Sequence, residues 1–216
     1  MTEQAAPHDW IEWHRAYADA DSALARRLAI VQAQVARVLE ERRAGPIRVL
    51  SMCSGEGRDL IEPFARLGVA DRVHGRLVEL DPTLAGRARD GIATARLAGL
   101  EVCEGDAGNT SAYEGATPAD LVLVCGVFGN ITDADIRGTI RGLPSLCAEG
   151  ATVVWTRHRR PPDLTPAIRR WFRAAGFRHE RVIRVPDSLS SVGVEQFVGV
   201  PKPLVPGERL FEFVEP

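Results

Sequence analysis

The sequence predicts an α/β protein built on an open, mostly parallel sheet of seven strands, with one antiparallel strand and helices on both faces. Between residues 47 and 176, segments of strand character alternate with segments of helical spacing, a pattern typical of consecutive βα units. Two further β-type segments, 179–185 and 192–200, follow with no helix between them. They must pair as a hairpin, so one of them runs antiparallel to the rest.

Helix caps and apolar spacing set the bounds of the expected elements. Asp81-Pro82 and Thr132 each precede a segment of helical spacing, as N-cap residues do. The run 120–125 is apolar without alternation, which indicates a strand buried on both faces. The predicted strands are 47–52, 73–80, 100–103, 120–125, 151–156, 179–185 and 192–200, and the predicted helices are 59–67, 82–97, 133–147 and 165–176. A polar loop, 157–163, and a Pro-rich tail complete the pattern.

The composition indicates a single domain. The chain has 216 residues, 45% of them hydrophobic, which is enough for a substantial core, and it contains no internal repeat. The formal net charge of -2 gives no general reason to expect nucleic acid or an anionic membrane as a partner. The chain begins without a signal peptide pattern and has no apolar run of membrane-spanning length, so we expect a cytoplasmic protein.

The four cysteines give no sign of a metal site. Cys53, Cys103, Cys125 and Cys147 lie far apart, without CxxC spacing or a cluster of histidines. We expect small, buried, reduced thiols.

Two helices are expected before the first strand. A capping box at Asp9 starts the first, which carries an aromatic stripe, Trp10, Trp13, His14 and Tyr17. This stripe could pack against the core or form a lid over a ligand. The second helix, capped by Asp21 or Ser22, carries an apolar stripe from 24 to 39 that we expect to be core.

The first strand leads into the turn Cys53-Ser54-Gly55-Glu56-Gly57, which has the form of a nucleotide-binding loop. Its glycines allow close approach of backbone N–H groups, and the following helix N-terminus adds a partial positive charge. A dinucleotide fingerprint needs a third glycine three residues after Gly57, where this chain has Leu60. An NAD site is therefore disfavoured.

Acidic residues follow the next two strands, at the edge where such sheets bind ligands. Glu79, ~20 residues after Gly57, can accept hydrogen bonds from a ribose diol, although it could be a solvated strand-end charge. Asp106 can accept from an adenine amino group, with the backbone of Ala107 against the ring, or it can form an Asx turn. Small residues from Gly126 onward suit the space where a cofactor meets its substrate.

In the order of these motifs, residues 45–200 resemble class I S-adenosylmethionine-dependent methyltransferases. Residues 51–57 fall on the family's acid-x-Gly-x-Gly-x-Gly loop, Glu79 on its ribose acid, and Asp106-Ala107 on its adenine pair. Ser51 replaces the acid of the first motif and Cys53 replaces its first glycine. Asp59 is a candidate partner for the cofactor's amino group, or a favourable charge at a helix N-terminus.

The resemblance implies a Rossmann-like methyltransferase fold, with residues 45–216 as the S-adenosylmethionine-binding methyltransferase domain and 1–44 as an N-terminal helical lid. It implies cofactor binding by Tyr17, Cys53, Ser54, Gly55, Gly57, Asp59, Glu79, Leu80, Asp106, Ala107, Cys125 and Gly126.

The implied reaction is methyl transfer to oxygen, nitrogen or carbon of a small-molecule acceptor. His158, after the fifth strand, and His14, on the lid, are the candidate bases. The residues that follow the predicted strand 120–125 lack the Asn/Asp-Pro-Pro-aromatic signature of enzymes that methylate exocyclic base amines. This argues against DNA as the methyl acceptor. Two alternatives stay open: a protein that binds the cofactor without transferring methyl, and an RNA methyltransferase using the loop 157–160.

Overall fold

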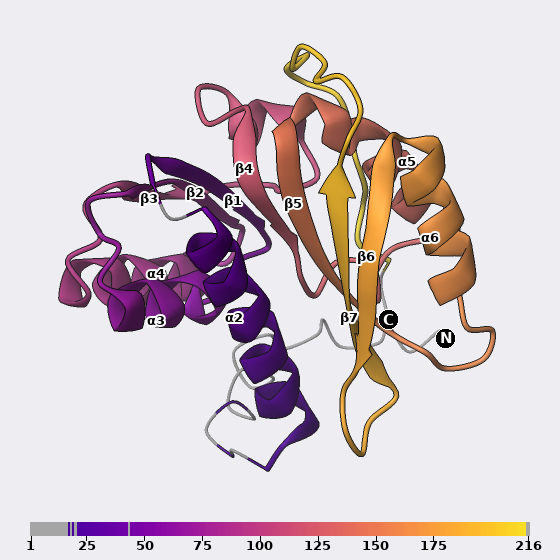
Figure 1. Cartoon of the computed structure of the whole chain (residues 1–216), viewed down its shortest axis with the longest axis horizontal. Helices are drawn as coiled ribbons and strands as arrows, with labels where there is room; N and C mark the ends of the chain where they lie inside the picture. Colours follow the sequence, from indigo (N-terminus) through magenta and orange to yellow (C-terminus); the bar gives the residue numbers. More distant parts are fainter. Residues whose placement is uncertain (1–16, 18, 20, 43, 215–216) are drawn as a thin grey trace, which may run out of the picture.

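A seven-stranded sheet in the order β3-β2-β1-β4-β5-β7-β6 forms the centre of the protein (Figure 1). The structure is a computed structural model, and it describes residues 17, 19, 21–42 and 44–214. The strands are β1 (Ile47–Met52), β2 (Val73–Glu79), β3 (Leu100–Glu104), β4 (Ala119–Val124), β5 (Cys147–His158), β6 (Phe177–Arg184) and β7 (Ser190–Phe197).

Strand β7 is the reversed strand. It pairs antiparallel with both β5 and β6, whereas β1 to β5 pair with one another in parallel. The predicted fold class, including the hairpin and the single reversed strand, is therefore confirmed.

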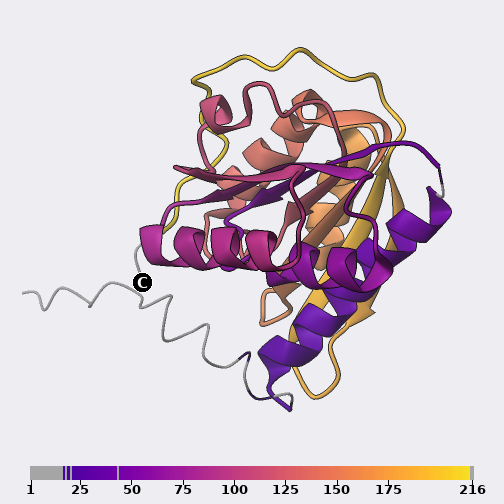
Figure 2. The same ribbon diagram turned by 90° about the vertical axis from the view of Figure 1, so that its left-hand side faces the viewer.

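Helices cover both faces of the sheet. On one side lie α2 (Ala23–Glu41), α3 (Arg58–Leu67) and α4 (Pro82–Thr94), and on the other lie α5 (Asp133–Gly142) and α6 (Thr165–Ala174) (Figures 1 and 2). Each face has its own buried cluster. The predicted stripe of α2, represented by Val31, Val35 and Leu39, packs in one cluster with residues of β1 and α3, so it is core as expected.

The predicted caps are present. The Ser22 hydroxyl accepts a hydrogen bond from Ala25 N at 3.0 Å, and Asp81 accepts from the backbone N–H groups of Thr83 and Leu84. At the start of α5, Thr132 Oγ1 accepts from Asp135 N at 3.1 Å. Each cap satisfies N–H groups that the first helical turn leaves without a partner.

The boundary between α5 and β5 differs from the prediction. The helix ends at Gly142 rather than near 147, because Pro144 lies in a separate 3-10 turn, Leu143–Ser145. Strand β5 extends to His158 because β7 continues the ladder, with Arg157 opposite Ser191 and His158 opposite Ser190. Arg157 and His158, expected in a loop, therefore belong to the strand.

The Pro-rich tail packs back onto the protein. Leu210 and Phe211 are buried in the cluster that also contains α5 side chains. In Figure 2 the segment after β7 (yellow) passes around the sheet on the side opposite α3 and α4. Nothing in the sequence predicted this packing.

Of the first predicted helix, the structure describes only Tyr17. The capping box at Asp9 and the residues Trp10, Trp13 and His14 lie outside the described residues. The N-terminal lid stays a prediction.

Gly86 and Gly91 of α4 allow a test of how α4 packs against α3. Gly86→Ala should raise the free energy of unfolding by about 0.5–1 kcal/mol, because alanine restricts the unfolded chain and favours a helix. A Cβ at Gly86 would have no neighbour within 4 Å, whereas one at Gly91 would lie 3.2 Å from Ile61 Cδ1. Gly91→Ala should therefore raise the free energy of unfolding, measured by urea denaturation, by a smaller amount. An equal gain at both positions would contradict the packing of α4 on α3.

Candidate functional site

A cavity of 330 Å³ lies at the carboxyl ends of β1, β2, β3 and β4. Its walls combine the turn after β1, the residues that follow the other three strands, the N-terminal part of α2 and one C-terminal residue. The lining residues are Tyr17, Arg27, Leu28, Val31, Cys53, Ser54, Gly55, Glu56, Arg58, Asp59, Glu79, Leu80, Asp81, Leu84, Asp106, Ala107, Cys125, Gly126 and Phe213. The structure thus brings together all the predicted cofactor residues except Gly57.

Left-handed backbone shapes the turn between β1 and α3. Cys53, Gly55 and Gly57 have φ angles of 50°, 56° and 71°. Cys53 occupies the position where the resemblance places a glycine, and its backbone keeps a conformation that glycine adopts most easily. Gly57 points into the protein: a Cβ there would lie 2.6 Å from Leu77 Cδ2. Its role is the close packing of the turn, and it does not line the cavity.

Glu79 is a buried carboxylate held by two backbone donors. Its side chain is 8% exposed. Gly55 N donates to Oε2 at 2.6 Å, and Asp81 N donates to Oε1 at 2.9 Å. A carboxylate has about four acceptor positions, so each oxygen can accept one more hydrogen bond. The alternative of a freely solvated charge is excluded by the burial and the fixed orientation.

Asp59 lies in the first turn of α3 and is 9% exposed. Its Oδ1 is buried and has no hydrogen-bond partner among the residues that the structure describes. Burial raises the pKa of this carboxyl to about 7, against the opposing effects of the N–H groups at the start of α3 and of Arg27. Ser54 Oγ, also in the cavity wall, is likewise buried without a partner in the described part of the chain.

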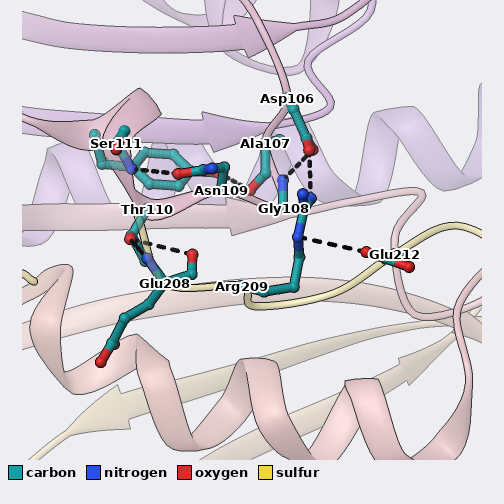
Figure 3. A network of polar contacts seen from close by, with 10 residues as sticks. Asp106, Ala107, Gly108, Asn109, Thr110, Ser111, Glu208, Arg209 and Glu212 are labelled. Atoms are coloured by element: carbon teal, nitrogen blue, oxygen red, sulfur yellow. Dashed lines mark hydrogen bonds and ion pairs between the residues drawn. The ribbon is translucent and has the colours of Figure 1, made fainter. Parts of the chain in front are cut away.

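Asp106 links the loop after β3 to the C-terminal segment (Figure 3). Its Oδ1 accepts from Gly108 N at 2.7 Å, which is an Asx turn, and its Oδ2 pairs with Arg209. The ion pair is half exposed, so we expect it to orient Asp106 more than to stabilise the fold. The turn alternative is therefore observed, and the adenine contact stays a prediction.

The cavity's thiols and its phenol favour their neutral forms. Burial raises the pKa of Cys53, of Cys125 and of Tyr17, the last against the effect of Arg27. The Arg58 guanidinium lies 5.7 Å from the centre of the Tyr17 ring. A cysteine thiolate nucleophile is thus disfavoured here.

His158 lies outside the cavity wall. A Cβ at Gly129 would lie 3.8 Å from its Cδ2, so the ring is beside the loop after β4. Its Nδ1 accepts from Arg160 N at 3.3 Å. Burial, then Arg157 and Arg160, lowers its pKa, which favours neutral imidazole. His158 stays a predicted base, and His14 lies outside the described residues.

Arg157 supports the loop after β4. Its side chain is 9% exposed, and its Nη1 donates to the carbonyl of Phe128. The Arg157 guanidinium is therefore largely withdrawn from solvent.

Part of the cavity wall was not predicted from the sequence. Arg27 and Leu28 face the cavity from α2, and Leu84 does so from α4. Leu28 belongs to the apolar stripe that we expected to be core, whereas no motif in the sequence pointed to Arg27 or Leu84. Phe213 carries no comparable signal, because it lies in a Pro-rich tail without periodicity.

All four cysteines are free; Cys147 is buried as expected, whereas Cys53, Cys103 and Cys125 are only partly buried. Within residues 17, 19, 21–42 and 44–214, no group of three His, Cys, Asp or Glu side chains could hold a metal ion. In the same ranges, no helix combines the length and the apolar character needed to cross a membrane.

The fold is similar to that of known methyltransferase structures, although no similar sequence was found. No protein-family model and no curated protein sequence matches the chain. Among solved structures, magnesium protoporphyrin IX methyltransferase from Synechocystis, with bound S-adenosylmethionine, superposes with a TM-score of 0.68. The identity is 14%, over 87% of this chain and 90% of that one.

Two further structures have related folds. An O-methyltransferase family protein from Burkholderia thailandensis gives a TM-score of 0.58 at 19% identity, over 87% of this chain; the match spans only 63% of that longer protein. Precorrin-6y C5,15-methyltransferase from Geobacter metallireducens gives a TM-score of 0.56 at 14% identity, over 76% of this chain and 87% of that one. The strand order, the reversed β7 and these superpositions together identify the architecture as the Rossmann-like class I methyltransferase fold.

Proposed function

We propose that this protein is an S-adenosylmethionine-dependent methyltransferase that acts on a small-molecule acceptor. One observation carries the proposal. A single cavity joins a glycine turn, the buried carboxylate of Glu79, and an acidic residue, Asp59, whose Oδ1 has no partner in the described structure. Similarity of fold to methyltransferases with bound S-adenosylmethionine or S-adenosylhomocysteine supports it.

The residues present fit this cofactor. The cavity volume of 330 Å³ lies within the range of about 300–1,000 Å³ usual for small-molecule and cofactor sites. Glu79 would accept from the ribose hydroxyls, and Asp59 would pair with the amino group of the methionine moiety. Asp106 and Ala107 would hold the adenine. When bound, the cofactor supplies a methyl group already activated by a sulfonium.

The task left to the protein is alignment and exclusion of water. The turn 53–57, held to Glu79 through Gly55 N, positions the cofactor end of the site. The neutral thiol of Cys125 and the backbone of Gly126 form the wall where β4 ends, the side from which an acceptor would approach. His158 is beside that loop, and we propose that it receives a proton when the acceptor must lose one.

The burial of Arg157 bears on the RNA alternative. A side chain bound to Phe128 O is poorly placed to contact phosphates in solution. One arginine of the loop 157–160 is thus withdrawn from solvent while Arg160 stays exposed, which favours a small-molecule acceptor, methylated at oxygen, nitrogen or carbon, over RNA.

Calorimetric titration with S-adenosylmethionine, S-adenosylhomocysteine and NAD tests the cofactor class. We expect saturable binding of the first two and none of NAD. Absence of binding by both adenosyl compounds would overturn the proposal. Turnover of tritiated cofactor over a panel of small acceptors then tests transfer. Tight binding with no turnover on any acceptor would favour a protein that binds the cofactor without transferring methyl.

A further inference from the structure

We propose that the C-terminal segment 208–214 is part of the cofactor site and that Phe213 packs against the nucleobase. This inference rests on the function proposed above. It assigns a binding role to a segment that the sequence predicted only as a tail.

The first half of this segment is tied to the loop after β3. Thr110 N donates to Glu208 O at 3.0 Å, and Leu210 N donates to Gly108 O at 2.7 Å. Between these bonds, Arg209 pairs with Asp106 (Figure 3). The segment is thus fixed directly beside the residues expected to bind adenine.

The second half is tied to the loop after β4. Phe213 forms a β-bridge with Ile131, and Val214 N donates to Asn130 O at 2.9 Å. Between the two halves, Phe211 is buried in the core. Its ring contacts the Phe213 ring edge to face, with 5.7 Å between the ring centroids. The segment therefore connects two loops of the same sheet edge and places Phe213 in the cavity wall.

The chemistry of this part of the wall suits a purine. Leu80 and Phe213 line the cavity, yet they remain 68% and 42% exposed. Ligand cavities are lined mainly by apolar side chains with a few polar groups, so these two side chains offer surface that a ligand would cover. Asp106, which lines the same cavity, offers a carboxylate as an acceptor for an amino group. Apolar surfaces combined with a polar acceptor match the faces and the edge of adenine, and stacking on an aromatic ring is a common way to hold a base.

The test compares binding of S-adenosylhomocysteine and of adenosine to the wild type and to variants of Phe213. Phe213→Ala should weaken binding of both ligands about tenfold, because the base loses the aromatic ring on which it stacks. Phe213→Tyr keeps the ring and should restore affinity. Val214→Ala is the matched control: its backbone bond to Asn130 is retained, its side chain does not line the cavity, and affinity should not change.

The outcomes separate the two proposals. If the wild type binds neither ligand, the proposed function fails, and this inference fails with it. If the wild type binds S-adenosylhomocysteine and Phe213→Ala binds equally well, only the role of Phe213 is overturned. Failure of Phe213→Tyr to restore affinity would also overturn it. Thermal unfolding of each variant checks that the fold is intact.

Discussion

Glu79→Ala is expected to weaken binding of S-adenosylmethionine by about 1–3 kcal/mol, the range for hydrogen bonds to a charged group. The proposed ribose diol would lose both acceptors at once. The effect should be large because Glu79 is buried and its carboxylate is already oriented by Gly55 N and Asp81 N, so no ordering cost offsets the hydrogen bonds. Calorimetric titration measures the loss.

Two further variants make the result interpretable. Glu79→Gln keeps the shape and one oxygen acceptor, so it should lie between the wild type and Glu79→Ala. Glu104→Ala removes an acid that also ends a strand but is half exposed, pairs with Arg89 and does not line the cavity, so affinity should be unchanged. Wild-type affinity in Glu79→Ala would refute the ribose assignment.

Binding of S-adenosylmethionine is expected to strengthen as pH rises from 5 to 7. The pKa of Asp59 is raised to about 7, so at pH 5 the carboxyl is protonated and must lose its proton to pair with the ligand's ammonium. Well below this pKa, the dissociation constant should fall about tenfold per pH unit. Asp59→Asn should bind at least about tenfold more weakly at pH 7, as expected for a lost charge-assisted bond, and should lose this pH dependence.

The stability of the ligand-free protein should decrease over the pH range in which binding strengthens. Because the folded-state pKa of Asp59 lies above the ordinary value of 3.8, the folded protein without ligand binds more protons than the unfolded chain between about pH 4 and 7. Its free energy of unfolding therefore decreases as pH rises through that window. Asp59→Asn needs no ionisation, so at pH 8 it should unfold at a higher temperature than the wild type.

A variant that binds more weakly yet is more stable cannot be explained by misfolding. Asp90→Asn, on the exposed surface of α4, is the matched control and should retain the wild-type affinity profile. A flat pH profile in the wild type would show that Asp59 does not pair with the amino group.

Much of the fold could be predicted from local sequence. The runs that form β1 and β4 are apolar and short, and Ser22, Asp81 and Thr132 cap helices with their own side chains. The chain order of βα units leaves few permitted connections, so the sheet and its reversed strand followed. The helix end at Gly142 was missed although Pro144 lies just beyond it, and the end of β5 at His158 was missed because it depends on pairing with β7, more than thirty residues away.

Part of the cavity could be predicted from the sequence for the same reason. Residues just after parallel strands meet at one edge, so Gly55, Glu79 and Asp106 could be expected together without knowing any contact between them. The state of Asp59 could not be predicted. A carboxyl at a helix N-terminus is ordinarily ionised, and here burial within the assembled cavity opposes ionisation.

The sequence by itself determined the α/β architecture, the order of the ligand-facing residues and the class of ligand that they suit, because these depend on short-range patterns and chain topology. Only the tertiary structure decided that Arg209 pairs with Asp106 and that Phe213 closes the cavity wall. These contacts join residues about a hundred positions apart, in a segment without periodicity. Their energy comes from burial of Leu210 and Phe211 and from backbone bonds to two distant loops.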